Sequence, residues 1–119
     1  MPSIFYGDEV GIEEDAPDFS RKCYPWGNEN DVILNWYKTL ARIRKHKVFK
    51  QGKMEVIKAR SKEIVFKRIN NDETILVIAN LDEDGYVYYD GNKYKSLING
   101  EVKDRITVKY AQIDILIKV

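Results

Sequence analysis

The spacing of hydrophobic positions changes partway along this chain. Between residues 30 and 47, apolar side chains recur every three or four positions, which predicts one amphipathic helix. Asn30 is expected to cap the N-terminus of this helix, and the basic residues at 44–47 are expected in its last turn, where they complement the helix dipole. The apolar face of the predicted helix carries Ile33, Trp36, Tyr37, Leu40 and Ile43.

From residue 53 onward, apolar and polar residues alternate, which predicts strands. Turn-forming residues, such as those at 70–72 and 90–92, separate the runs. The run at 74–81 is almost continuously apolar, which predicts a central strand covered on both faces. The predicted strands span 54–60, 63–69, 74–81, 86–90, 93–98, 105–109 and 112–119. Short strands with close turns indicate an antiparallel β-sandwich.

The start of the chain follows neither pattern. Ser3 to Tyr6 is mostly apolar and aromatic, and it predicts a short buried strand that breaks at Gly7 into an acidic loop. Such a strand needs neighbours on both sides and cover on both faces. We therefore interpret the chain as beginning within a larger fold.

A series of motifs carries a family resemblance. They are Pro2-Ser3-Ile4-Phe5-Tyr6-Gly7-Asp8-Glu9-Val10-Gly11, then Pro17-Asp18 with Arg21-Lys22, then Tyr24-Pro25-Trp26, the segment 34–47, and Leu97-Ile98-Asn99-Gly100-Glu101. In this order they resemble the P-x-I-x-Y-Y-G-D-E-x-G, D-P-D-N-R-R, P-Y/F-P-W, last-barrel-helix and L-L-T-G-E segments of the alpha-amylase family of glycoside hydrolases. The sequence departs from the family at Phe19-Ser20 and Cys23, and its loop is one residue longer.

The resemblance implies an α+β fragment in two parts. Residues 1–50 would be a remnant of the catalytic (β/α)8 barrel, namely its last strand, the loop after it and its last helix. Residues 51–119 would be the C-terminal antiparallel β-sandwich domain. The form of the loop around Tyr24-Pro25-Trp26 resembles the neopullulanase and cyclomaltodextrinase branch of the family.

The implied function belongs to a parent enzyme that cleaves or transfers α-glucosidic bonds of starch-like oligosaccharides with retention. The family's catalytic acids lie on earlier barrel strands, and their motifs are absent from this sequence, so the resemblance implies a structural domain without catalysis of its own. Asp8 and Glu9 are adjacent, and neighbouring carboxylates rarely face each other across one bond. An alternative is a standalone, non-catalytic β-sandwich module that binds α-glucans or another protein.

The resemblance also suggests sugar-binding residues for the intact parent. In the family, the loop after the last barrel strand supplies an acid and an arginine to sugar hydroxyls, and the matching positions here are Asp18 and Arg21. Trp26 has an apolar face on which a sugar ring can stack. A large aromatic side chain after proline more often packs beneath its own loop, so burial is the favoured interpretation for Trp26.

The amino-acid composition argues against several classes of function. With 20 basic and 19 acidic residues, the net charge of +1 gives no attraction to nucleic acid or to an anionic membrane. One cysteine and one histidine predict no intrachain disulfide, no ordinary zinc site and no cofactor, and the lone Cys23 favours a reducing compartment such as the cytoplasm. His46 is expected to be a solvated helix cap. Flat aromatic rings can stack on sugars, but packing on the sheet is the favoured interpretation for Tyr86, Tyr88, Tyr89 and Tyr94.

The expected partners are the catalytic barrel of the parent chain and, in the intact enzyme, a maltooligosaccharide. The predicted helix face would meet that barrel. Without it, the exposed apolar side chains predict self-association of this chain.

Overall fold

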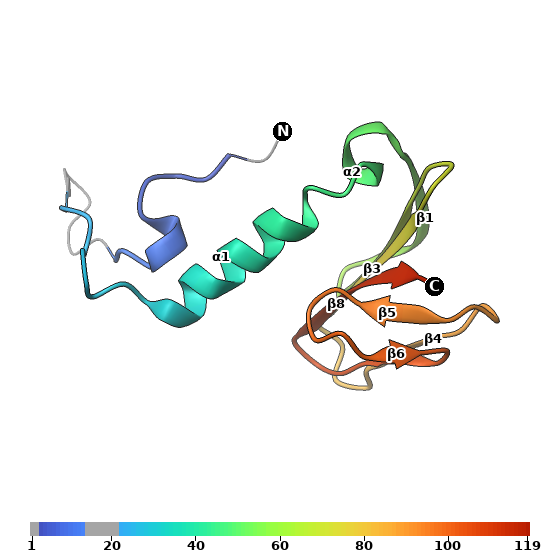
Figure 1. Ribbon diagram of the computed structural model, residues 1–119. Helices are drawn as coiled ribbons and strands as arrows, with labels where there is room; N and C mark the ends of the chain where they lie inside the picture. The colour runs from blue at the N-terminus through green and yellow to red at the C-terminus, as the bar shows by residue number, and fades with distance from the viewer. Residues whose placement is uncertain (1–2, 14–21) are drawn as a thin grey trace. The chain divides into compact units, whose positions relative to one another are not determined.

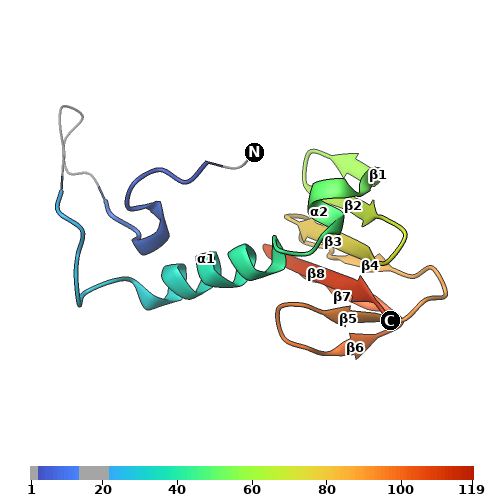
Figure 2. The same cartoon turned by 45° about the horizontal axis from the view of Figure 1, so that its top comes forward.

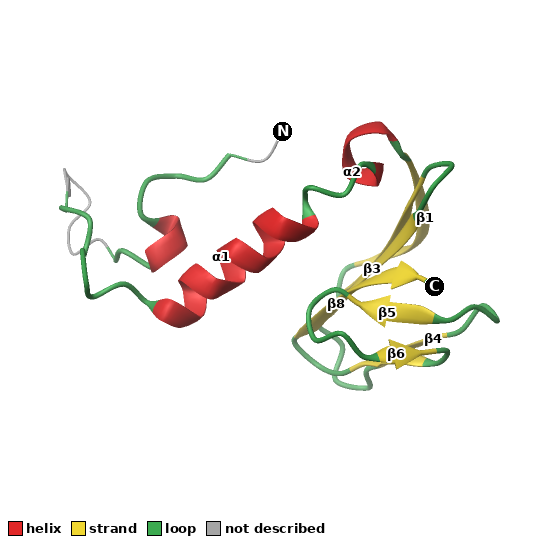
Figure 3. Cartoon of the chain, viewed as in Figure 1, coloured by secondary structure: helices red, strands yellow, loops and turns green. Residues whose placement is uncertain are grey.

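The computed structural model describes residues 3–13 and 22–119, and its elements are labelled in Figure 1. The chain divides into two compact units between Arg44 and Lys45. Helices occur only before residue 52 in the described chain, and strands only after it, as Figure 3 shows. Within the described residues, no helix is long and apolar enough to cross a membrane.

The first unit is built around helix α1, Asp31–Ile43, which packs against a 3-10 turn, η1, Asp8–Val10. Val10, at the end of that turn, is buried. The predicted helix cap is confirmed, because Asn30 Oδ1 accepts a hydrogen bond from the backbone N–H of Ile33 at 3.2 Å.

The predicted strand at Ser3–Tyr6 is wrong. These residues form neither helix nor strand, and Ile4, Phe5 and Tyr6 are all exposed. No strand of the described chain pairs with them. A strand is stabilised by a hydrogen-bonded neighbour, and hydrophobic sequence alone does not replace it.

The predicted last turn of the long helix is also wrong. Helix α1 ends at Ile43, and a separate short helix, α2, begins at Val48 and ends at Gln51. The backbone N–H of Val48 is satisfied by the carboxylate of Glu73, at 3.0 Å, which gives α2 an N-terminus of its own. Arg44 caps the C-terminus of α1, with its backbone N–H donating to the Leu40 carbonyl at 2.8 Å, and residues 45–47 connect the two helices.

The second unit contains a six-stranded sheet and a two-stranded sheet, seen from another side in Figure 2. The strands are β1 (Lys53–Arg60), β2 (Glu63–Ile69), β3 (Thr74–Asn80), β4 (Tyr86–Tyr88), β5 (Tyr94–Ser96), β6 (Val102–Lys103), β7 (Ile106–Val108) and β8 (Gln112–Lys118). The larger sheet has the order β1-β2-β3-β8-β5-β6, and β4 pairs with β7 in the smaller one. All pairs are antiparallel.

Residues from both sheets form one hydrophobic core. It comprises Val65, Leu76, Ile78, Tyr88, Tyr94, Ile106, Val108 and Leu116, with Tyr86 packed against it. Strands of the smaller sheet, β4 and β7, lie between strands of the larger one along the chain, and the larger sheet is complete only when the last strand, β8, is in place. This arrangement confirms the predicted α+β chain with an antiparallel β-sandwich.

Strand β3 is the central strand that its sequence predicts. Leu76 and Ile78 point into the core between the sheets, while Ile75 and Val77, on the opposite face, are also buried. The neighbours β2 and β8 pair with β3 on either side. The predicted strands match the observed ones to within two residues, but the two-residue strand β6 was not predicted because it is too short for alternation to be visible.

Candidate functional site

The structure describes only one of the three predicted sugar-binding residues. Asp18 and Arg21 lie outside the described residues, and Trp26 lies within them. Trp26 is 81% exposed, so the expected burial beneath the loop is wrong.

A tight turn explains the exposure of Trp26. The backbone N–H of Asn28 donates to the carbonyl of Pro25 at 2.8 Å, which places Trp26 and Gly27 at the two central positions of a β-turn. Gly27 has a φ of +78°, the left-handed conformation that a type II turn needs at its third residue. The backbone N–H of Trp26 also donates to the carbonyl of Tyr24, at 2.9 Å. These bonds hold the Trp26 indole at the tip of the turn.

Three aromatic rings gather around this turn. The Tyr24 and Trp26 ring centroids are 4.5 Å apart and the ring planes are inclined by 46°. The Tyr6 ring contacts the Tyr24 ring edge-on, with the two centroids 6.5 Å apart. We call these residues, Tyr6, Tyr24 and Trp26, the aromatic cluster. Tyr24 is half-buried between its two neighbours, and Trp26 and Tyr6 are exposed.

Polar groups lie beside the aromatic cluster. Desolvation, together with the nearby carboxylates of Glu9 and Glu29, raises the pKa of the Tyr24 phenol, so this hydroxyl stays protonated at neutral pH. A pocket of about 330 Å³ lies along the same segment, and its lining includes Pro25, Asn28 and Asn30. The site therefore combines exposed aromatic faces with groups that donate and accept hydrogen bonds.

The adjacent acids Asp8 and Glu9 both lie in η1. Asp8 Oδ2 accepts a hydrogen bond from the backbone N–H of Phe5, at 3.2 Å, which fixes the turn before η1. The charge of Glu9 contributes to the raised pKa of the Tyr24 phenol. This arrangement supports the structural role expected for Asp8.

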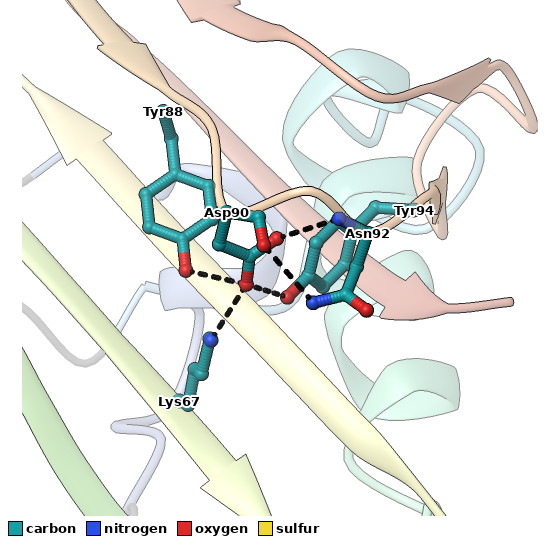
Figure 4. Close-up of polar contacts among 5 residues, drawn as sticks. All are labelled: Lys67, Tyr88, Asp90, Asn92 and Tyr94. Atoms are coloured by element: carbon teal, nitrogen blue, oxygen red, sulfur yellow. Dashed lines mark hydrogen bonds and ion pairs between the residues drawn. The ribbon is translucent and has the colours of Figure 1, made fainter.

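A polar network lies at one end of the sandwich, drawn in Figure 4. Asp90 Oδ2 accepts hydrogen bonds from the Tyr94 hydroxyl at 2.8 Å, the Tyr88 hydroxyl at 2.9 Å and Lys67 Nζ at 2.9 Å. The backbone N–H of Asn92 donates to the other carboxylate oxygen of Asp90, Oδ1, at 3.1 Å. The network joins β2, the end of β4 and β5 through one carboxylate.

The shifted pKa values of Asp90 and Tyr94 suit a structural role for this network. Partial burial opposes ionisation of Asp90, but hydrogen bonds from Lys67, Tyr94 and Tyr88 outweigh it and hold the pKa of Asp90 well below its ordinary value. Burial and the hydrogen bond to Asp90 raise the pKa of Tyr94, so its phenol is a poor nucleophile or base. Tyr88 and Tyr94 pack in the core, which confirms the expected sheet packing of these two tyrosines. The same expectation is wrong for Tyr89, whose ring is exposed.

His46 is not the solvated cap that the sequence predicts. Its Nδ1 lies 2.7 Å from Glu73 Oε2, and because an ionised carboxylate only accepts, Nδ1 carries the proton. Glu73 also accepts from the backbone of Val48, and Arg68 donates to the Val48 carbonyl. Partial burial opposes ionisation of Glu73, but the hydrogen bonds from His46 and the Val48 N–H outweigh it and lower its pKa. These contacts hold α2 against the β2–β3 hairpin.

Metal binding finds no support in the part of the chain that the structure describes. No three His, Cys, Asp or Glu side chains come together there in the manner of a metal site.

Known proteins provide an independent comparison. No protein-family model matches the chain. A cyclomaltodextrinase from a Bacillus species is 32% identical over 90 residues, which are 71% of this chain and 16% of that protein. A cyclomaltodextrinase from Thermoanaerobacter pseudethanolicus is 36% identical over 83 residues, 67% of this chain and 14% of that protein. The chain resembles a segment of alpha-amylase-family hydrolases.

This finding confirms the resemblance carried by the sequence motifs. The crystal structure of an Anoxybacillus alpha-amylase superposes with a TM-score of 0.79 at 17% identity, covering 96% of this chain and 28% of that one. At this identity the likeness establishes the fold. The chain spans about one sixth of the length of the cyclomaltodextrinases that it matches.

Sequence reasoning missed the residues that support Trp26. Tyr24 was considered only as part of a motif, and the signal for its role was the Pro-x-Gly spacing after it, which predicts a tight turn. The sequence places Asp90 only at the end of a predicted strand and in the turn that follows it. Its role as a common acceptor depends on residues that the fold brings to it.

Proposed function

We propose that this chain is the C-terminal part of an alpha-amylase-like glycoside hydrolase and serves there as a structural domain without catalysis of its own. The observation that carries the proposal is its similarity, over about two thirds of its length, to a small share of two cyclomaltodextrinases. The order of motifs along the sequence supports the C-terminal placement. The parent would act with retention on α-glucosidic bonds of starch-like oligosaccharides.

The two parts of the chain have separate roles in this proposal. Residues 1–50 would contribute the loop and last helix of the catalytic barrel and, where barrel neighbours are present to pair with it, the last strand, while residues 51–119 would form the C-terminal β-sandwich domain. The catalytic barrel is thus the partner of the sandwich. The polar network around Asp90 and the buried central strand β3 make the sandwich a firmly packed unit, which suits a structural domain.

The loop after the 3-10 turn is proposed to contact substrate in the parent. By resemblance, Asp18 and Arg21 would hydrogen-bond sugar hydroxyls, since a planar guanidinium suits paired oxygen acceptors. Trp26 would stack on a sugar ring. The exposure of its indole at the tip of a fixed turn supports this role.

A segment exchange tests the proposal. In the Thermoanaerobacter cyclomaltodextrinase, the matching 83-residue segment is replaced by the corresponding residues of this chain. We expect a soluble chimera that hydrolyses cyclodextrin, because the sandwich and helix would supply the same structural contacts. The present chain alone, assayed beside it, is expected to release no reducing sugar from maltoheptaose.

Two controls make the result interpretable. The same cyclomaltodextrinase lacking the segment should be inactive or insoluble, which shows that the segment is needed. A second chimera carrying Leu76→Asp, a charge in the buried core, should also fail. An inactive chimera despite an intact fold, or hydrolysis by this chain alone, would refute the proposed function.

A further inference from the structure

The turn between β5 and β6 contains Asn99-Gly100, the one place in the sequence where glycine follows asparagine. At such a dipeptide the backbone nitrogen of the glycine, once deprotonated, attacks Cγ of the asparagine and forms a cyclic imide. Water carries the proton to the side-chain nitrogen, the bond from Cγ to that nitrogen breaks, and ammonia leaves. Water then opens the imide to aspartate or isoaspartate. Glycine favours the reaction because no side chain crowds its nitrogen.

The folded turn engages both reacting groups, although Asn99 and Gly100 are exposed to water. The N–H of Gly100, which must lose its proton, donates to the carbonyl of Ser96 at 3.0 Å. The side-chain oxygen of Asn99 accepts from the N–H of Glu101, also at 3.0 Å. For Cγ to turn onto the Gly100 nitrogen, both hydrogen bonds must break. The reaction therefore requires the turn to open locally.

Ser96 anchors this turn to the sheet. The residue is buried, and its N–H donates to the carbonyl of Glu101 at 2.8 Å. Its hydroxyl donates to Asp114 Oδ1 of β8 at 2.7 Å. The same hydroxyl oxygen accepts from the N–H groups of Ile98 and Asn99, at 3.2 and 3.3 Å. One side chain thus connects the turn to the neighbouring strand and orders its backbone.

We propose that Asn99 is a site of spontaneous deamidation that the folded sandwich keeps closed, and that Ser96 is the positioning residue that closes it. Opening of the β5–β6 turn then sets the rate of the modification. This inference goes beyond the proposed function and does not depend on it.

The modification has a structural consequence at the edge of the larger sheet. Strand β6 is two residues long and pairs only with β5, immediately beyond the turn. Isoaspartate adds one methylene group to the main chain at residue 99, which shifts Gly100 away from the Ser96 carbonyl. The product therefore holds β6 less firmly than the original turn does.

The first experiment compares the folded 119-residue chain with the same chain in concentrated urea, both kept at mildly alkaline pH. Peptide mapping by mass spectrometry follows the conversion of Asn99 with time. We expect conversion in the folded chain to be at least about tenfold slower than in urea, because two hydrogen bonds must first open. Equal rates in the two states, or no conversion in urea, would overturn the proposal.

A variant tests the role of Ser96. Ser96→Ala keeps the backbone carbonyl but removes the hydroxyl, so folded Ser96→Ala should deamidate about fivefold faster than the folded wild type. In urea the two chains should react at the same rate, since no fold then restrains the turn. Ser61→Ala, at an exposed turn of the same sandwich, is the control and should react as the wild type does. An unchanged rate in folded Ser96→Ala would remove Ser96 from the proposal.

A measurement on the wild type keeps the proposal testable if Ser96→Ala fails to fold. Amide hydrogen exchange of Gly100 reports the opening of its bond to the Ser96 carbonyl. We expect folding to slow this exchange at least about tenfold, in step with the slowing of deamidation. A Gly100 amide that exchanges as fast in the folded chain as in the unfolded one would show that the turn does not protect Asn99.

Discussion

The ammonium nitrogen of Lys67 lies 2.9 Å from Asp90 Oδ2, although 23 positions separate the two residues in the chain. Their side chains are mostly buried, with 16% and 20% of their surfaces exposed. The same carboxylate oxygen accepts from two tyrosines, so the loop after β4 is tied to β2 and β5 at once. This pair therefore connects strands that are distant in sequence.

Asp90→Asn should lower the free energy of unfolding of the sandwich by about 2 kcal/mol, because it leaves the Lys67 ammonium without its counter-charge. Urea unfolding followed by far-UV circular dichroism measures the change. The double variant Lys67→Met with Asp90→Asn should recover part of the loss, since both charges are then removed. An Asp90→Asn variant as stable as the wild type would show that the pair contributes little.

Glu73→Gln should cost about 1 kcal/mol at neutral pH, because an amide is a weaker acceptor for His46 and for the Val48 N–H. The pKa of Glu73 is lower in the folded chain than its ordinary value of 4.5. Its stabilisation is therefore complete above about pH 4.5 and is lost as the pH falls through the lower folded value.

Thermal unfolding of wild type and Glu73→Gln at a series of pH values checks this pH dependence. The difference between the two proteins should narrow below about pH 4.5. Glu83→Gln, at an exposed turn residue, serves as the control and should change stability little at any pH. A difference that grows on acidification would contradict the role assigned to the Glu73 carboxylate.

Asn30→Ala should destabilise helix α1 by about 1 kcal/mol, because it removes the side-chain acceptor for the N–H of Ile33. Amide hydrogen exchange in α1 is the measurement, and faster exchange in its first turn is expected. Asn30→Asp keeps the acceptor and places a negative charge at the positive end of the helix dipole, so it should retain protection. Equal exchange in Asn30→Ala and the wild type would argue against the cap.

The exposed apolar side chains of α1 predict self-association. Trp36 and Leu40 are 40% and 39% exposed, although both lie on the apolar face of the helix. Leu40→Lys should weaken self-association about tenfold, since it places a charge in the apolar contact. Light scattering over a range of concentrations measures the effect. Asn35→Lys adds the same charge at an exposed polar position and is the control, and a monodisperse wild-type monomer would contradict the prediction.

Local sequence determined much of the sandwich. The runs over 63–69 and 112–119 predict strands there, and successive residues of a strand point to opposite faces, so that Val65 and Leu116 face the core while Ile64 and Ile113 are exposed. The continuous apolar run of β3 likewise predicted a strand covered on both sides. The cap at Asn30 was predictable for the same reason, since its acceptor and donor lie three residues apart in the chain.

The tertiary structure decided whatever depends on distant partners. Ser3 to Tyr6 has the composition of a strand, but the described chain offers it no neighbour with which to pair. The positive charges at 44–47 suit the end of a helix. The carboxylate of Glu73, far along the sequence, instead accepts a hydrogen bond from the backbone N–H of Val48, where the second helix begins. Trp26 has the hydrophobicity of a buried residue, and the turn at Gly27 places it in solvent.

The sequence by itself therefore determined the elements of the sandwich, the helix cap and the resemblance to alpha-amylase-family hydrolases, because these depend on the identity and spacing of nearby residues. Only the tertiary structure joined Lys67 to Asp90, His46 to Glu73 and Tyr24 to Trp26 with a defined inclination. Hydrogen bonds and ring contacts depend on distances of a few ångströms, and chain folding sets those distances.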